Sequence, residues 1–438
     1  MPANVLVAQS GGPSPVINNT LRGIIDACRA YPSTFGRLYA GWHGIEGVLK
    51  EELLDLSTQD QREIELLRTT PAAGSIGTCR YKLREEHSAD FERVIEVFHA
   101  HEIGYFFYIG GNDSMDTASK ISRLARERGL DLVAVGVPKT IDNDVGDSAF
   151  KLVDHTPGYG STARYFAQTI LNANEENAGS CPADPVLVIQ AMGRRVGFIP
   201  AAARLADPQR EMPLQIYLAE AGPTLERIGA NVLDCLRQFG RCIIVVSEGL
   251  DVGDLGEVGD AFGHTAFGSS RSSVAQIVCN YLNGLQLPAR GKARYQIPGT
   301  DQRSAAIYAS TVDMEEAYQV GRKCVQIARD DGGGWMGTIL RKQGSTYAAV
   351  YDKVALEQVA NSERFFPRAW IDQSGFDVTD DFVRYAQPLI GENWPDVPLV
   401  SGLQRFARFK PAFAERKCGD YVPEVYRRRG SSNSRQES

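Results

Sequence analysis

Short hydrophobic runs alternate along this chain with stretches in which hydrophobic residues recur every three or four positions. Residues 4–8, 105–109 and 131–137 are continuous β-rich runs, which are typical of buried strands. A helix is predicted after the first run, because hydrophobic residues repeat with helical spacing at Val16, Ile17, Leu21, Ile24, Ile25 and Cys28. A second helix is predicted over about 114–128. This order of strand, loop and helix predicts parallel βαβ units.

The same rhythm continues through the middle of the chain. Further strands are predicted at 185–190, 214–218, 241–247 and 294–297. Further helices are predicted at about 201–206, 224–238, 272–282 and 313–329. No long linker and no short repeat interrupts this pattern. We therefore expect at least two α/β units.

Composition and charge narrow the class of protein. Hydrophobic residues make up 43% and charged residues 23% of the 438 residues, which is a globular mix and excludes a fully disordered chain. The net charge of −7 argues against a nucleic-acid partner held through its phosphates. No apolar stretch approaches the ~20 residues of a membrane span, and the N-terminus lacks the features of a signal peptide. We expect a cytoplasmic protein with no membrane partner.

The cysteines and histidines do not predict a metal centre. None of the eight cysteines forms a C-x-x-C pair, and most lie in hydrophobic segments. The six histidines form no H-E-x-x-H motif. We expect small buried cysteines in a reducing compartment, and no zinc site.

Two glycine-rich loops follow predicted strands, at 10–15 and 110–114. Ligands of parallel α/β sheets bind beyond the carboxyl ends of the strands. Glycine allows the backbone to approach an anion, and the following helix N-terminus offers free N–H groups. Neither loop matches the P-loop or the dinucleotide fingerprint. From these residues alone, a phosphate site and a plain tight turn are both open.

A dense polar cluster follows the strand at 131–137, in the segment Pro-Lys-Thr-Ile-Asp-Asn-Asp. One carboxylate, Asp142 or Asp144, could accept a hydroxyl proton while another group orients a metal, with Lys139 and Thr140 beside them. A capped turn is the alternative interpretation, because Asp and Asn favour turns. Two later strands are followed by Met-Gly-Arg and Ser-Glu-Gly.

Gly-Gly-Asn-Asp-Ser, Pro-Lys-Thr-Ile-Asp-Asn-Asp and Met-Gly-Arg, in this order and with these separations, resemble the phosphofructokinase family in its pyrophosphate-dependent branch. The resemblance covers roughly residues 3–330. It implies an α/β fold of two Rossmann-like three-layer lobes with parallel-rich sheets. It places a donor-binding lobe at 1–152 plus about 303–375, a sugar-phosphate lobe at 153–302, and a C-terminal extension with a basic polar tail at 376–438.

The resemblance also implies a reaction and a donor site. The reaction is reversible phosphoryl transfer from pyrophosphate to the C1 hydroxyl of fructose 6-phosphate, in glycolysis and gluconeogenesis. Asp142 matches the general base, and Arg80 an arginine that bridges the donor and the transferring phosphate. The predicted contacts of the donor are Gly11, Gly12, Gly111 and Ser114. Asn112 and Asp144 are the predicted Mg²⁺ residues, with an amide in place of the commoner aspartate.

The substrate side follows from the same resemblance. Met192, Gly193 and Arg194 match the sugar-phosphate loop, Glu248 the carboxylate that binds sugar hydroxyls, and Thr140 and Ile141 contacts beside the base. Arg294, Thr300 and Arg303 lie in the segment that grips the 6-phosphate, for which an arginine fork is suited. Because the family builds this pocket across a subunit interface, we expect a homodimer or homotetramer.

Asp113 and Lys139 select the donor in this interpretation. ATP-using members have glycine at both positions. The Asp113 carboxylate would fill the space of the ATP α-phosphate with like charge, and Lys139 would neutralise pyrophosphate. Three alternatives stay open: an ATP-dependent enzyme, sedoheptulose 7-phosphate as an additional acceptor, and a non-catalytic subunit. A dinucleotide oxidoreductase is disfavoured by the missing fingerprint.

Overall fold

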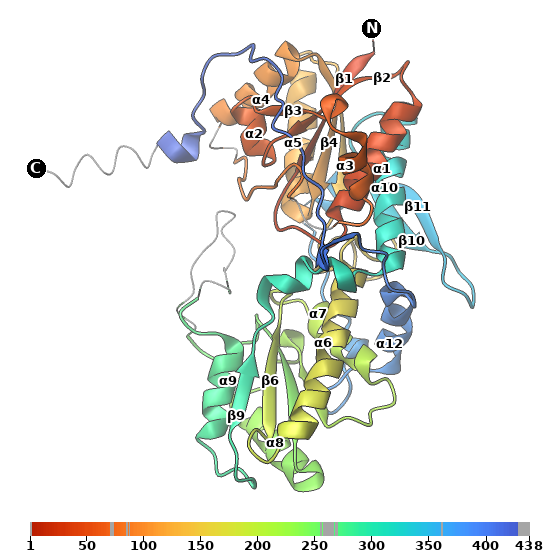
Figure 1. Cartoon of the computed structure of the whole chain (residues 1–438). Helices are drawn as coiled ribbons and strands as arrows, with labels where there is room; N and C mark the ends of the chain where they lie inside the picture. Colours follow the sequence, from red (N-terminus) through yellow and green to blue (C-terminus); the bar gives the residue numbers. More distant parts are fainter. Residues whose placement is uncertain are drawn as a thin grey trace, which may run out of the picture.

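The computed structural model describes residues 2–70, 74–84, 86, 88–254, 256, 267, 270–360 and 362–427. Its larger sheet has seven strands in the order β11-β10-β5-β4-β1-β2-β3. Their bounds are β1 Ala3–Gln9, β2 Phe35–Gly41, β3 Leu53–Asp55, β4 Ile103–Gly110, β5 Val133–Pro138, β10 Trp335–Arg341 and β11 Ala349–Ala355. The five inner strands are parallel, and the two edge strands β3 and β11 are antiparallel to their neighbours (Figure 1).

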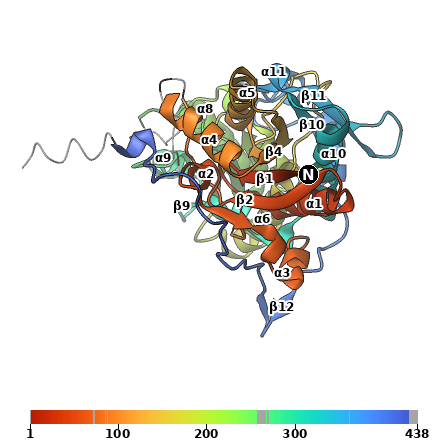
Figure 2. The same ribbon diagram turned by 90° about the horizontal axis from the view of Figure 1, so that it is seen from above.

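Alternate residues of β1 face two different helical layers. Val5 and Val7 share a hydrophobic core with α1 and α10, whereas Leu6 and Ala8 share another with α4 and α5. Viewed from above, these two helix pairs lie on opposite sides of the sheet (Figure 2). Because every side chain of β1 from Val5 to Ala8 is buried, the strand is a continuous hydrophobic run. The helices of this lobe are α1 Ile17–Ala30, α2 Ile45–Leu49, α3 Gln61–Leu66, α4 Ser88–Ala100, α5 Asn112–Glu127, α10 Thr311–Asp330 and α11 Leu356–Val359.

The second lobe is built on a four-stranded parallel sheet in the order β7-β8-β6-β9. Helices α6 and α12 cover one face together with the short α7, and α8 and α9 cover the other. The strands are β6 Val186–Ala191, β7 Leu214–Tyr217, β8 Cys242–Ser247 and β9 Ala293–Gln296. The helices are α6 Tyr159–Ser180, α7 Phe198–Ala201, α8 Leu225–Phe239, α9 Val274–Asn283 and α12 Asp380–Ala386. The prediction of two three-layer α/β lobes is confirmed.

The chain after β11 contributes to both lobes. Phe382 and Tyr385 of α12 belong to the core of the second lobe. The chain then passes a two-stranded hairpin, β12 Leu399–Val400 and β13 Leu403–Gln404, and returns to the first lobe, where Phe409 is buried. The predicted lobe boundaries stay a prediction, and the end of the predicted basic tail, 428–438, lies outside the described residues.

Most predicted elements appear within one or two residues of their expected bounds. The helix expected from about Ser114 begins at Asn112, and the helix expected at 201–206 is a 3-10 segment, Ala202–Ala206, that continues α7. Within the described residues no cysteine forms a disulfide, and six of the eight are buried. No described helix is long and apolar enough to span a membrane.

Candidate functional site

The loop after β1 is joined to a second loop by two hydrogen bonds. Gly11 donates its N–H to the Cys79 carbonyl at 2.9 Å, and Thr78 Oγ1 donates to the Gly11 carbonyl at 2.9 Å. Gly11 has a φ of +76°, a left-handed backbone conformation in which a residue with a side chain would be strained. Arg80 follows directly on this second loop and is exposed. The two loops therefore bring the predicted donor glycines and Arg80 together.

Three cationic side chains converge on Gly12. A Cβ at Gly12 would lie 2.5 Å from Arg303 Nη1, so a larger residue would push this guanidinium away, and it would lie 3.9 Å from Arg80 Nη2, which is ordinary contact. Lys139 Nζ donates to the Gly12 carbonyl at 2.6 Å. Since the backbone of the loop is uncovered and cations surround it, this place is suited to a phosphate group.

The second glycine loop starts helix α5. Gly111 is the N-cap and supplies no side-chain cap, so the N–H groups of Asn112 and Asp113 at the start of the helix are suited to an anion, whereas Ser114 donates its N–H to the Gly111 carbonyl at 3.0 Å. A Cβ at Gly110 would lie 2.0 Å from Ser114 Oγ, which shows how tightly the buried Ser114 packs on this loop. Asp113 is the second residue of the helix rather than its cap, and its Oδ1 forms an ion pair with Lys82 Nζ at 2.6 Å.

The segment after β5 carries the central carboxylate. Asp142 is 9% exposed, its N–H donates to Thr140 Oγ1 at 3.1 Å, and its Oδ2 lies 3.6 Å from Arg194 Nε of the second lobe. Burial, with the nearby Asp144 carboxylate, raises the pKa of Asp142. Burial lowers the pKa of Lys139 to about 7, although the Asp142 carboxylate opposes this shift. Asp142 and Lys139 are thus both buried and close enough for the charge of each to shift the pKa of the other.

The second lobe contributes the Met-Gly-Arg loop after β6 and a carboxylate after β8. Glu248 Oε1 accepts hydrogen bonds from the N–H groups of Gly193 at 3.1 Å and Arg194 at 2.9 Å. Both donors have positive φ, +119° and +52°. Met192 donates its N–H to Gln302 Oε1 at 3.1 Å. Burial raises the pKa of Glu248 to about 7. The predicted sugar-phosphate loop and Glu248 therefore form one unit opposite Asp142.

Asn112 and Asp144 could hold a metal ion. Asn112 Nδ2 donates to the Asp144 carbonyl at 3.4 Å, which holds the Asn112 side chain against the backbone of Asp144. The Oδ1 atoms of both residues are buried and accept no hydrogen bond within the described structure. Such orphaned oxygens are unfavourable unless a cation is present, and amide and carboxylate oxygens suit Mg²⁺. The residues present therefore fit the predicted ion.

Two further predicted residues, Arg294 and Thr300, are exposed. Arg294, near the start of β9, is exposed and pairs with Asp184, just before β6, at the amino end of the smaller sheet. Thr300 is exposed at the start of the 3-10 segment Gly299–Arg303. Arg294 therefore lies at the opposite end of the smaller sheet from Met192 and Glu248, which follow the carboxyl ends of β6 and β8. The assigned role of both residues in gripping a phosphate stays a prediction.

Several residues around the cluster were not predicted. Lys82 forms an ion pair with Asp113, and Gln302 accepts a hydrogen bond from the N–H of Met192 in the Met-Gly-Arg loop. The side chain of Asn143 is hydrogen-bonded to Arg364 and Tyr385. Lys82 lies two residues after Arg80 and could have been noticed as a second cation in that loop. Arg364 and Tyr385 belong to no motif. They lie more than 200 positions from Asn143 in the chain, so nothing in the sequence indicates that they contact it.

Comparison with known proteins agrees with this geometry. The model of the family Phosphofructokinase matches residues 4–328. The chain is 39% identical over 428 residues to the pyrophosphate–fructose 6-phosphate 1-phosphotransferase of Halomonas elongata, covering 95% of this chain and 99% of that protein. It is 38% identical over 410 residues to the protein of the same name from Methylococcus capsulatus, covering 91% and 94%. The chain belongs to the phosphofructokinase family, as its motifs predicted.

A solved structure points to the same branch. The pyrophosphate-dependent phosphofructokinase from Marinobacter aquaeolei matches with a TM-score of 0.85 and 36% identity, covering 96% of this chain and 99% of that one. Both the sequence relatives and this structural neighbour span nearly the whole chain. The similarity therefore includes the segment after residue 328, which the family model does not reach.

Proposed function

We propose that this protein transfers a phosphoryl group from pyrophosphate to the C1 hydroxyl of fructose 6-phosphate, giving fructose 1,6-bisphosphate and phosphate, in both directions. The observation that carries the proposal is Lys139, whose buried Nζ contacts the Gly12 carbonyl in the donor loop. A cation there matches the charge of a bare diphosphate. The names of the two relatives with 38–39% identity support the same donor and acceptor.

Asp142 serves as the general base in this proposal. It accepts the proton of the C1 hydroxyl as the C1 oxygen forms a bond to phosphorus and the bridging P–O bond of pyrophosphate breaks. The leaving phosphate departs on the side of the glycine loops. Because burial and Asp144 raise the pKa of Asp142, its carboxylate is a better proton acceptor than an exposed aspartate. Thr140 Oγ1 and Arg194 orient it.

Lys139, Arg80 and Arg303 stabilise the charge on the transferring group, together with the N–H groups of the glycine loops. Phosphoryl transfer asks a protein mainly for positioning and charge stabilisation. Mg²⁺, which phosphofructokinases generally use, would be held by Asn112 and Asp144 and would neutralise charge on the diphosphate oxygens. The position of Arg303 Nη1, 2.5 Å from where a Cβ of Gly12 would stand, supports a role at the donor as well as at the sugar.

The sugar phosphate lies between Asp142 and the second lobe. Glu248 and the loop Met192–Arg194 bind the sugar, and Thr300 and Arg303 face its 6-phosphate. Arg294 is 69% exposed in its side chain and too far from the cluster, which supports a site completed by a neighbouring copy. We accordingly expect a homodimer or homotetramer, working in the cytoplasm.

A donor panel tests the proposal. Purified protein, Mg²⁺ and fructose 6-phosphate are mixed with pyrophosphate or with ATP, and fructose 1,6-bisphosphate is measured through aldolase. We expect product with pyrophosphate and little with ATP. Product with ATP alone would overturn the donor assignment, and absence of product with both donors would overturn the reaction. Sedoheptulose 7-phosphate is included as a second acceptor, because sugar length depends on pocket shape.

A further inference from the structure

Asn143 lies between Asp142 and Asp144 in the chain, and both ends of its side-chain amide are hydrogen-bonded. It is fully buried with a φ of +59°, a conformation that is uncommon for residues other than glycine. Its Nδ2 donates to the Tyr385 hydroxyl at 2.8 Å. Its Oδ1 accepts from the Thr156 N–H at 3.1 Å. The conformation of the residue between Asp142 and Asp144 therefore depends on partners from other segments.

The principal partner lies far along the chain. Tyr385 belongs to α12, beyond the residues 4–328 that the family model matches. Its hydroxyl also donates to the Asp154 carbonyl at 2.9 Å, so it bridges the catalytic segment and the segment that precedes α6. From the same region, Arg364 donates its N–H to the Asp144 carbonyl at 2.8 Å. Arg364 is fully buried and also bonds to the Asp154 carbonyl.

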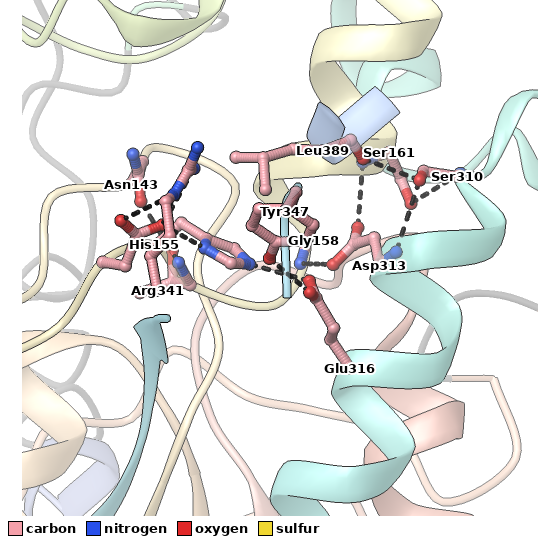
Figure 3. Close-up of polar contacts among 12 residues, drawn as sticks. Asn143, His155, Gly158, Ser161, Ser310, Asp313, Glu316, Arg341, Tyr347 and Leu389 are labelled. Atoms are coloured by element: carbon pink, nitrogen blue, oxygen red, sulfur yellow. Dashed lines mark hydrogen bonds and ion pairs between the residues drawn. The ribbon is translucent and has the colours of Figure 1, made fainter. Parts of the chain in front are cut away.

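Asp154, whose carbonyl accepts the Tyr385 hydrogen bond, takes part in a further network of buried polar contacts. His155 lies between the carboxylates of Asp154 and Glu316, with 2.8 Å hydrogen bonds to each (Figure 3). Burial lowers the pKa of His155, but the two carboxylates outweigh this effect and raise the pKa to about 9. The charged imidazolium therefore forms an ion pair with each carboxylate. Close by, Asp313 accepts the N–H groups of Gly158 and Ser161 at 2.9 Å each, which holds the first turn of α6 (Figure 3).

We propose that Tyr385 is a positioning residue for phosphoryl transfer: its hydroxyl holds Asn143 in the left-handed conformation that aims Asp142 at the substrate and Asp144 at the metal site. The inference rests on the proposed function and extends it to a segment outside the motifs. Tyr385 touches no substrate atom in this proposal. It acts through Asn143, because a rotation at that residue would move both flanking carboxylates together.

Removal of the hydroxyl in Tyr385→Phe leaves the ring contacts with Phe150, Trp370 and Arg341 possible. It leaves the buried Asn143 amide without its acceptor, so the segment relaxes. Loss of an outer partner of a metal or catalytic group typically costs about 10- to 100-fold in activity. We expect kcat to fall by that factor. The KM for fructose 6-phosphate should change less than about threefold, because the Tyr385 hydroxyl bonds to Asn143 and to the Asp154 carbonyl, not to Glu248 or the Met-Gly-Arg loop.

Tyr217→Phe is a matched control for lost stability. Tyr217 is fully buried in β7, and its hydroxyl also makes one donated and one accepted bond, to Gln215 Oε1 at 2.8 Å and from Asn231 Nδ2 at 3.1 Å. Each variant loses one buried hydroxyl and its two hydrogen bonds, but only the Tyr385 hydroxyl contacts the catalytic segment. We expect similar falls in thermal unfolding temperature and a fall in kcat in Tyr385→Phe alone. An equal kcat in Tyr385→Phe and the parent, or an equal loss in both variants, would overturn the proposal.

A double-mutant cycle tests the route through Asn143. Asn143→Gly accepts the positive φ but removes the side chain that Tyr385 holds. Once Asn143 is glycine, adding Tyr385→Phe should lower kcat less than twofold further, because the two residues act as a unit. Independent losses that multiply would overturn the proposal. If Tyr385→Phe does not fold, a parental kcat in Asn143→Gly overturns it. The parent is assayed first, since an inactive parent would refute the proposed function rather than this inference.

Discussion

Lys139 Nζ donates a hydrogen bond to the Gly12 carbonyl at 2.6 Å, which joins the loops that follow β5 and β1. The two strands are not neighbours, because β4 lies between them in the sheet. Their carboxyl ends nevertheless meet, since Gln9 is paired with Ile109 and Gly110 with Pro138. The contact places a buried ammonium group against the backbone of the predicted donor loop, and our expectations for donor choice and pH dependence both rest on it.

The affinity for pyrophosphate should fall as pH rises through about 7. Burial lowers the pKa of Lys139 to about 7, so the free enzyme loses this cation above that pH. The KM for pyrophosphate is measured from pH 6 to 8.5 at constant free Mg²⁺ in the parent and in Lys139→Arg, whose guanidinium stays charged. The ionisation of pyrophosphate itself affects both KM values equally, so it drops out of their ratio. A ratio that does not change with pH would contradict the prediction.

Asp142→Ser should lower kcat by about 10²–10⁴, which is the usual contribution of a general base. The KM for fructose 6-phosphate should move much less, because Glu248 and the loop Met192–Arg194 remain. Steady-state kinetics with pyrophosphate and fructose 6-phosphate check both values. A variant with the turnover of the parent would show that another group takes the proton.

Asp113→Gly should make ATP a measurable but poor donor. The change removes a carboxylate from the proposed α-phosphate space and releases Lys82 from its ion pair. Pyrophosphate activity should fall as well, and full conversion should require Lys139→Gly in addition, with non-additive effects. Kinetics with both donors are compared among the parent, the two single variants and the double variant. Folded variants that bind fructose 6-phosphate but all fail to use ATP would show that donor selection lies elsewhere.

Arg303→Ala should weaken the binding of fructose 6-phosphate by about 1.5–3 kcal/mol, the value of a hydrogen bond to a charged group. The sequence assigns Arg303 to the sugar phosphate alone. Its position beside Gly12 and Arg80 leads us to expect a lower kcat with pyrophosphate too. Binding of each substrate by calorimetry, with kcat measured separately, distinguishes the two roles. A change in pyrophosphate affinity alone would assign the residue to the donor.

Much of the fold could be predicted from the sequence, because buried parallel strands are continuous hydrophobic runs and their helices repeat every three to four residues. The strands β1, β4, β5, β6, β7 and β8 were all predicted for this reason. The longest helix, α6 Tyr159–Ser180, was not: its hydrophobic side is interrupted by small and polar residues such as Gly160, Ser161 and Thr162, which are buried against other segments. Its hydrophobic pattern is therefore weak.

The sequence by itself determined the family and the main polar residues of the site. These residues follow strands directly, within short motifs whose spacing is set by local backbone geometry. Only the tertiary structure decided which distant groups complete the site: Lys82 opposite Asp113, Gln302 under Met192, and Tyr385 against Asn143. A single hydrogen bond between residues 242 positions apart leaves no periodicity in the chain, because its geometry exists only after both lobes have folded and met.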